Sequence, residues 1–114
     1  ASDVYKRQTL KGTGCSKGIV KGKVKVVLNP MNTEVEDGDI VVTKSTDPSW
    51  VMVFPLLKGL IVEKGSLLSH SAIISREMNI PAIVGVQGVT TALKTGDIVQ
   101  FDGSTGIIKK LDEI

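Results

Sequence analysis

The sequence predicts a small α/β domain with a β-rich core of several short strands and two or three short helices packed on it. Its 114 residues are enough for one domain and leave little room for a second core. Hydrophobic residues make up 41% of the chain but aromatic residues only 4%, so the core must be built from Val, Ile, Leu and Ala. The apolar segments are each only a few residues long, and 12 glycines place turns between them.

The domain is expected over residues 10–112, and residues 1–9 are interpreted as a disordered leader or linker because they carry no periodicity. The first strand is expected over residues 19–27, where Val alternates with Lys in the period-two pattern of a half-buried strand. After a turn at 36–39, the short apolar run at 40–43 predicts a second, buried strand. Nearby lysines are interpreted as a solvated strand face, with a docking surface for an acidic partner as the alternative: Lys17, Lys21, Lys23 and Lys25.

The next segment predicts a helix over residues 51–57. Thr46 or Asp47 is expected to cap its N-terminus, and Pro48 suits the first turn. Pro55 must bend or shorten this helix, because proline removes a backbone hydrogen bond. The only tryptophan of the chain, Trp50, is interpreted as the anchor of the helix.

A buried strand at residues 60–62 and a second helix at 69–78 are expected to follow. In that helix Ser71, Ile74 and Met78 fall on one stripe, which predicts its buried face. Asn79 is interpreted as the helix stop.

The last third of the chain is expected to be mostly β structure. A third buried strand is predicted over residues 82–86, and a short helix over 89–93. Two apolar runs then flank the turn residues 102–105, which predicts a closing β-hairpin.

Composition argues against several functional classes. A net charge of +2 and very few aromatic residues give nucleic acid neither a basic surface nor a stacking platform. The apolar runs are too short to span a bilayer, and the first residues lack a signal peptide's apolar core, so a cytoplasmic protein is expected. Cys15, alone in the chain, excludes an intrachain disulfide and is interpreted as a bystander in a glycine-rich turn.

The single histidine, His70, has a distinctive setting. The residues before it predict a strand, a turn at Gly65 and then the first turn of a helix. A helix N-terminus presents unpaired N–H groups and a partial positive charge, which suit a phosphate and disfavour a protonated imidazole. A neutral imidazole beside an anion site is what a phosphohistidine carrier needs; the alternative is that His70 only packs against or caps the helix.

Residues 65–85, GSLLSHSAIISREMNIPAIVG, resemble the phosphohistidine signature of PEP-utilising enzymes. That signature runs Gly-Gly-x-Thr/Leu-Ser-His-x-Ala-Ile-x-Ala-Arg-Glu-x-x-Ile-Pro-Ala-Val-Val-Gly. The resemblance extends over residues 12–111, including the segment at 46–50 and the closing hairpin from residue 96. The family includes phosphoenolpyruvate synthase, pyruvate phosphate dikinase, rifampin phosphotransferase and enzyme I of the sugar phosphotransferase system.

The resemblance implies a swivelling β/β/α domain whose histidine accepts a phosphoryl group at one active site and delivers it at another. His70 takes the place of the phosphorylated histidine, and Ser69, which matches the loop before it, is assigned to the catalytic residues with it. Gly65 and Ser66 match the loop that leads into the histidine helix, where they would position the phosphate. Ser66 stands where the family has its second glycine, and a serine there still permits a turn.

The resemblance also covers an Arg-Glu pair further along this helix, Arg76 and Glu77. Arg76 could contact phosphate or a docking domain, since a guanidinium fork suits phosphate oxygens. We favour the alternative, a surface pairing of Arg76 with Glu77 or Glu63. The acidic residues offer no convincing metal site, so no metal is expected: Asp47, Glu63 and Glu77.

The resemblance further implies partner domains, in the same chain or in trans. An ATP-grasp domain would load the histidine, and another domain would hold the acceptor substrate. ATP and Mg²⁺ would bind the partner domain and not this one, because no Gly-x-x-x-x-Gly-Lys-Ser/Thr loop is present. The acceptor itself cannot be identified from this domain.

Leu68 stands where dikinases and many synthases have a regulatory threonine, so that regulation is not expected. A Leu-Ser-His sequence is closer to rifampin phosphotransferase and to synthase-like proteins of unassigned substrate. Two alternatives stay open: an enzyme I type domain, and a non-catalytic binding or regulatory module with the same fold.

Overall fold

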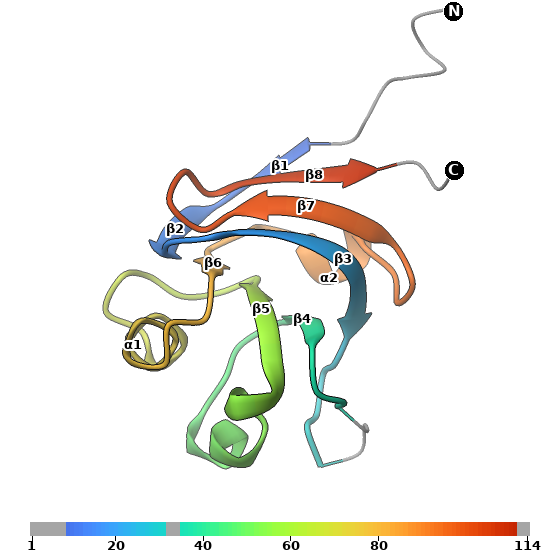
Figure 1. The fold of residues 1–114 in the computed structure, drawn as a ribbon. Coiled ribbons are helices and arrows are strands. Elements are labelled where there is room, and N and C mark those ends of the chain that lie inside the picture. Colours follow the sequence, from blue (N-terminus) through green and yellow to red (C-terminus); the bar gives the residue numbers. More distant parts are fainter. Residues whose placement is uncertain (1–8, 32–34, 112–114) are drawn as a thin grey trace, which may run out of the picture.

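The computed structural model describes residues 9–31 and 35–111 and shows two β-sheets and a layer of helices (Figure 1). The upper sheet has the order β1-β8-β7-β3, from β1 (Thr9–Lys11), β8 (Ile107–Leu111), β7 (Ile98–Asp102) and the first part of β3 (Ile19–Val26). Its neighbouring strands are antiparallel.

The lower sheet has the order β3-β4-β5-β6-β2. Its strands are the last part of β3, β4 (Asp39–Thr43), β5 (Leu57–Val62), β6 (Ala82–Val84) and β2 (Thr13–Ser16). Strands β3 to β6 run parallel, and β2 is antiparallel to β6. The long strand β3 belongs to both sheets, because residues 19–23 pair with β7 and residues 24–26 pair with β4.

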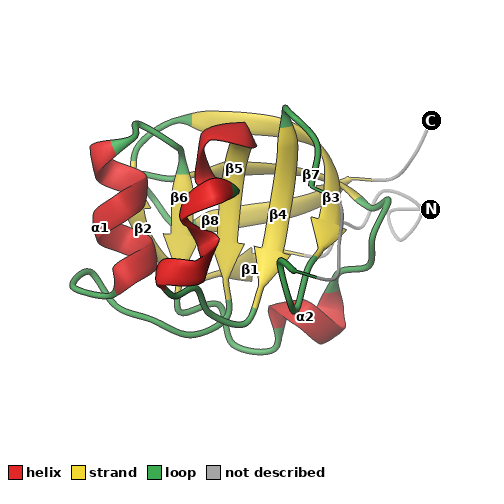
Figure 2. Ribbon diagram, turned by 90° about the horizontal axis from the view of Figure 1, so that it is seen from below, coloured by secondary structure: helices red, strands yellow, loops and turns green. Residues whose placement is uncertain are grey.

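Helices cover the lower sheet on the side away from the upper sheet (Figure 2). They are α1 (His70–Glu77) and the two short 3-10 helices η2 (Pro48–Met52) and η3 (Phe54–Leu56). A further short helix, α2 (Val89–Ala92), follows β6. The β/β/α arrangement expected from the resemblance is therefore confirmed. No helix in the described part of the chain is long and apolar enough to cross a membrane.

Two apolar clusters fill the spaces between the layers. Between the sheets, Phe101 packs with aliphatic side chains from both, including Val20, Ile61 and Ile83. Beneath the helices, Trp50 and Phe54 pack with Val41, Leu60 and Ala72, among others. Trp50 is only 2% exposed, which supports its interpretation as the anchor of η2.

Strand β2 and the β7–β8 hairpin approach each other so closely that glycine is required. A Cβ atom on Gly103 would overlap the carbonyl oxygen of Ser16, and one on Gly14 would lie 2.5 Å from the carbonyl oxygen of Gly103. In addition, the backbone N–H of Gly12 donates to the carbonyl of Gly106 at 2.8 Å. These contacts hold β2 and the residues before it against the turn of the β7–β8 hairpin.

Most predicted strands and the closing hairpin are present, but the helix predicted over residues 51–57 is wrong. The chain forms η2 and η3 there, and Leu57 already begins β5. A proline occupies the first positions of each 3-10 helix, which explains the interruption. Of the two predicted N-cap residues, Asp47 is the one observed: its side chain accepts a hydrogen bond from the backbone N–H of Ser49 at 2.9 Å.

The N-terminal strands β1 and β2 were not predicted. Thr9, assigned to the leader, is the first residue of β1 and pairs with Lys109 of β8. Cys15 lies buried in β2 and not in a turn, and burial raises the pKa of its thiol. The other residues assigned to the leader, 1–8, lie outside the described residues.

The second helix is present as α1, although its predicted buried stripe is only partly correct. Ser71 is buried and Ile74 half-buried, but Met78 is 40% exposed. Small side chains make the close contact with the sheet instead: Ser71, Ala72 and Ser75. Asn79 ends the helix with a φ of 57°, as its role as a stop requires.

Candidate functional site

The candidate site lies where the parallel strands β4 and β5 end. Carboxyl ends of parallel strands share one edge of a sheet, and ligands of open α/β sheets bind outside that edge. β4 continues into residues 44–47, and β5 continues into the loop 63–69 that precedes α1. The two segments touch, because the N–H of Lys64 donates to the carbonyl of Lys44 at 2.9 Å.

The loop before α1 is shaped by one glycine and its own hydrogen bonds. Gly65 has a φ of 126°, and a Cβ atom there would lie 2.9 Å from Ser69 Oγ. Ser69 Oγ donates to the carbonyl of Ser66 at 2.8 Å, and Ser66 Oγ accepts from Leu68 N at 3.3 Å. The loop therefore closes on itself and delivers the next residue, His70, to the start of the helix.

The N-terminus of α1 is open to an incoming anion. Ser69 is the N-cap residue in an extended conformation, but its side chain makes no capping hydrogen bond because it is turned towards Ser66. The first turn also contains no acidic residue. The first backbone N–H groups of an α-helix lack intrahelical partners, so this end keeps its partial positive charge for a ligand.

The imidazole of His70 is held by one of its two nitrogens. Thr46 Oγ1 lies 2.9 Å from His70 Nδ1, and the same oxygen lies 2.5 Å from Ser71 Oγ. The ring also meets Phe54 edge to face, with centroids 6.0 Å apart. Among the described residues, Nε2 has no hydrogen-bond partner, and the ring is half-buried. The predicted position of His70 in the first turn of a helix is confirmed, because His70 is the first residue of α1.

Sequence reasoning missed the part of Thr46 in this site. It was considered only as a helix cap and as part of the segment resembling the family, yet its hydroxyl bridges His70 and Ser71. The two partners lie 24 and 25 residues further along the chain, so no local pattern could have paired them. The only available signal was that residues 46–50 lie just after the buried strand predicted at 40–43.

Arg76 does not form the surface ion pair that was favoured. Its Nη2 donates to the carbonyl of Leu67 at 2.8 Å, and its Nη1 donates to the carbonyl of Cys15 at 3.4 Å. The guanidinium therefore ties the loop before His70 to helix α1 and to strand β2. Its predicted alternative roles, phosphate contact or domain docking, stay untested.

The glutamates offered as partners of Arg76 lie elsewhere. Glu63 Oε1 accepts from Thr90 N at 3.2 Å and from Thr90 Oγ1 at 2.6 Å, so it joins the site loop to α2. These hydrogen bonds lower the pKa of the Glu63 carboxyl. Glu77 is exposed near the end of α1. Within residues 9–31 and 35–111, no group of three or more His, Cys, Asp or Glu side chains is placed to hold a metal ion.

The position of Arg76 predicts how the loop responds to its loss. In Arg76→Met, the carbonyls of Leu67 and Cys15 lose their donor, while much of the aliphatic stem remains. At about 1 kcal/mol for such a bond, local opening should increase about fivefold. Amide hydrogen exchange of residues 67–69 should accelerate accordingly, and Glu77→Gln, on the same helix, should leave it unchanged. Equal exchange in both variants would show that Arg76 does not brace the loop.

Comparisons with known proteins agree with this geometry. The family model for the PEP-utilising enzyme mobile domain matches residues 35–106. The rifampicin phosphotransferase of Bacillus cereus is 42% identical over 112 residues, which cover 94% of this chain and 13% of that protein. The phosphoenolpyruvate synthase of Aeropyrum pernix is 39% identical over 101 residues, or 87% of this chain and 12% of that protein. The chain thus spans about an eighth of the length of these relatives.

Solved structures share the fold. An NMR structure of Enzyme I superposes with a TM-score of 0.59 and 32% identity, covering 70% of this chain and 33% of that one. Aconitase X of Thermococcus kodakaraensis has a TM-score of 0.71 over 92% of this chain and 99% of that chain, but at 22% identity it shows the fold alone. The family match extends over both the sheet edge and the histidine loop, and the chain belongs to the family of PEP-utilising enzyme mobile domains.

Proposed function

We propose that this chain carries phosphoryl groups on Nε2 of His70. The observation that supports this most directly is the asymmetry of the imidazole: Nδ1 is engaged by Thr46, whereas Nε2 has no partner among the described residues. A nucleophilic ring nitrogen needs a free lone pair. If Nδ1–H donates to Thr46 Oγ1, then Nε2 is the nitrogen that carries the lone pair.

The transfer uses the two ring nitrogens differently. The Nε2 lone pair attacks the terminal phosphorus of the donor in line, the P–N bond forms, and the P–O bond to the leaving group breaks with its electron pair going to that oxygen. In the tautomer proposed here Nδ1 keeps its proton and donates it to Thr46 Oγ1, whose own hydroxyl would then donate to Ser71 Oγ across the contacts of 2.9 and 2.5 Å. Delivery reverses these steps: an acceptor oxygen attacks phosphorus, and the electron pair of the P–N bond returns to Nε2.

The open N-terminus of α1 would stabilise the phosphorylated state. A phosphoryl group on His70 adds negative charge at the first residue of the helix, where unpaired N–H groups and the helix dipole favour an anion. Such stabilisation typically contributes about 0.3 to 1 kcal/mol at an exposed site. Gly65 and Ser66 would act through the shape of the loop, and Ser69 would position the ring.

The names of the relatives support a place for this carrier in a larger ATP-dependent phosphotransferase of the rifampicin phosphotransferase or phosphoenolpyruvate synthase type. An ATP-grasp domain with ATP and Mg²⁺ would load His70, and an acceptor domain would receive the phosphoryl group. Both would lie in the same polypeptide or act in trans, in the cytoplasm. The domain alone would not turn over ATP.

A second candidate is a domain of the enzyme I type, favoured by the 32% identity to the Enzyme I structure. The two candidate functions can be distinguished by their phosphoryl donors. Labelling of His70 by the nucleotide-binding domain of a rifampicin phosphotransferase with ATP and Mg²⁺ would support the first candidate. Labelling only with phosphoenolpyruvate and the catalytic domain of an enzyme I would support the second. Labelling by neither would contradict the carrier function.

Thr46 provides a test of the positioning that this function requires. Thr46→Val keeps the side-chain volume but leaves His70 Nδ1 without its partner, at a cost of about 1 to 3 kcal/mol, so phosphorylation of His70 should slow about 5-fold to 150-fold. Thr91→Val, at an exposed position of α2, is the matched control and should phosphorylate at the wild-type rate. Ring nitrogen shifts of His70 should change only in Thr46→Val. A wild-type rate in that variant would refute the positioning role of Thr46.

A further inference from the structure

The outer face of the upper sheet is left uncovered by every described helix, since α1, η2 and η3 lie beneath the lower sheet and Val89 of α2 packs into the cluster between the sheets (Figures 1 and 2). Alternation along the strands places basic and apolar side chains on this face, while Val20, Phe101 and Ile108 point into the core. We call it the lysine face. Its basic residues are Lys11, Lys21, Lys23 and Lys109, and its apolar residues are Ile19, Ile98, Ile107 and Leu111.

The strand register arranges these side chains in rows across the sheet. One row pairs Lys21 with Gln100 and Gln100 with Lys109. The neighbouring row begins with Ile19 opposite Asp102. Directly opposed Cβ atoms in such rows are about 5 Å apart, so each lysine has an apolar or polar neighbour within reach.

The charge of the lysine face is not neutralised within the described part of the chain. All four of its lysines are exposed, and none forms an ion pair with a described residue: Lys11, Lys21, Lys23 and Lys109. The single acidic residue on the face is Asp102, whose Oδ1 accepts from the backbone N–H of Ser104 at 2.8 Å. The face therefore presents a positive field to anything that approaches it.

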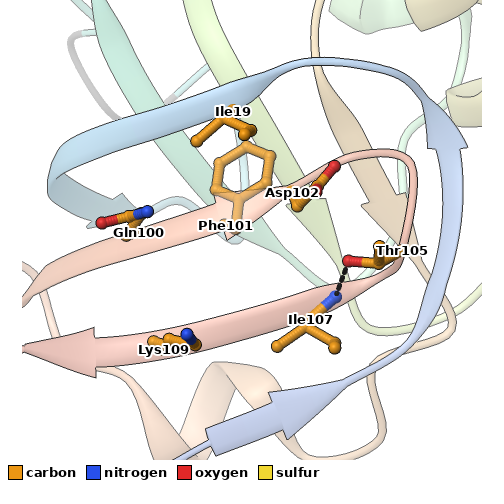
Figure 3. A pocket seen from close by; sticks show the side chains of 7 residues that line it. All are labelled: Ile19, Gln100, Phe101, Asp102, Thr105, Ile107 and Lys109. Carbon is orange, nitrogen blue, oxygen red and sulfur yellow. Dashed lines mark hydrogen bonds between the residues drawn. The ribbon is translucent and has the colours of Figure 1, made fainter.

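A cavity of about 240 Å³ opens on this face (Figure 3). Ile19 and Ile107 form its apolar part on this face, and Phe101 lies beneath it with its side chain in the core. The polar members of its lining are Gln100, Asp102, Thr105 and Lys109. Ile19, the first residue of β3 at the edge of the upper sheet, is 69% exposed and so is available to an apolar side chain of a partner. An apolar cavity bordered by charge is the arrangement in which a projecting side chain of a partner is buried at protein interfaces.

We propose that the lysine face docks an acidic protein surface that inserts one apolar side chain between Ile19 and Ile107. Charge complementarity selects the partner, because its carboxylates would pair with the four unpaired lysines. Nucleic acid is disfavoured: no aromatic side chain of the described residues is exposed for base stacking, and the face has no arginine to grip phosphates. Isoleucines interleaved with the lysines suit an interface with a protein better than one with a nucleic acid.

This surface serves something other than phosphoryl transfer. The lower sheet separates the lysine face from α1 and His70 (Figure 1). A partner bound there leaves the histidine accessible, so docking and phosphorylation can occur together. The proposal therefore does not rest on the carrier function, and either can fail alone.

The test is an NMR titration of the ¹⁵N-labelled chain with a defined acidic peptide in which leucine alternates with pairs of glutamates. We expect saturable shifts confined to β1, β3, β7 and β8. The double variant Lys21→Glu/Lys109→Glu should weaken binding about tenfold or more through reversal of two charges. The control Lys64→Glu/Lys94→Glu changes net charge equally at exposed sites off this face and should bind as the wild type does.

One further variant and two other ligands complete the test. Ile19→Ala should weaken peptide binding without unfolding the chain, since Ile19 is mostly exposed. A DNA duplex and phosphatidylserine vesicles should bind more weakly than the peptide. The proposal is overturned if no saturable binding is seen, if shifts gather around His70, if the control pair weakens binding equally, or if DNA or vesicles bind at least as tightly.

Discussion

His70→Ala is expected to abolish phosphoryl transfer by this chain. No other histidine exists to replace it, and the nearby hydroxyls of Thr46 and Ser71 are occupied with each other. Labelling with the nucleotide-binding domain of a relative, ATP and Mg²⁺ should fall to background. In the wild type the label should be lost in acid and survive base, as a P–N bond does and a serine ester does not.

Controls separate loss of chemistry from loss of fold. The ring is half-buried against Phe54, so His70→Ala should lower the free energy of unfolding by only about 1 kcal/mol. Ser69→Ala should slow labelling without abolishing it, because Ser69 Oγ is bonded to the loop and not to the ring. Acid-labile phosphate on His70→Ala, or only acid-stable phosphate on the wild type, would contradict the carrier function.

Gly103→Ala should produce the largest loss of stability. The added methyl would overlap the carbonyl oxygen of Ser16 and crowd the backbone N of Ala82 at 3.1 Å, and backbone atoms cannot rotate away as side chains do. We expect a loss of about 3 kcal/mol or more, which lowers Tm by about 12 °C or more. Thermal unfolding followed by circular dichroism measures the shift.

The matched control is Gly22→Ala in β3. Its Cβ would meet only the flexible ends of two side chains, Ile40 at 3.2 Å and Lys58 at 3.8 Å, and alanine reduces the entropy of the unfolded chain. The free energy of unfolding should change by less than about 1 kcal/mol. Equal losses in the two variants would show that close approach of β2 to the hairpin does not explain the need for glycine at position 103.

The parallel strands and the hairpin were predictable because each is a compact apolar run bounded by turn residues. Strands β1 and β2 were not, since residues 9–16 contain only two apolar side chains, Leu10 and Cys15. Their stability comes from pairing with β8 and β6, far away in the sequence. Long-range pairing leaves no local periodicity, so Thr9 was assigned to the leader and the segment around Cys15 to a glycine-rich turn.

The candidate site was predicted only in part, because some of its contacts also join residues that are far apart in the sequence. His70 stood out because a strand, a glycine and a helix start are contiguous in the sequence. Thr46 and the backbone partners of Arg76 come from other elements and depend on how the loops meet at the sheet edge. The buried face of α1 was predicted only in part: Ser71 lies on the expected stripe, but Ala72 and Ser75 are buried with it while Met78 is exposed.

The position of the phosphoryl group on the ring is the most direct measurement. The chain labelled with ¹⁵N on its single histidine can be phosphorylated with phosphoramidate, which needs no partner domain, and its P–N coupling then identifies the bonded nitrogen. The hydrogen bond between Thr46 and Nδ1 predicts phosphorus on Nε2 of His70, with Nδ1 still protonated. Phosphorus on Nδ1, or on a serine with the ring unmodified, would contradict the proposed carrier.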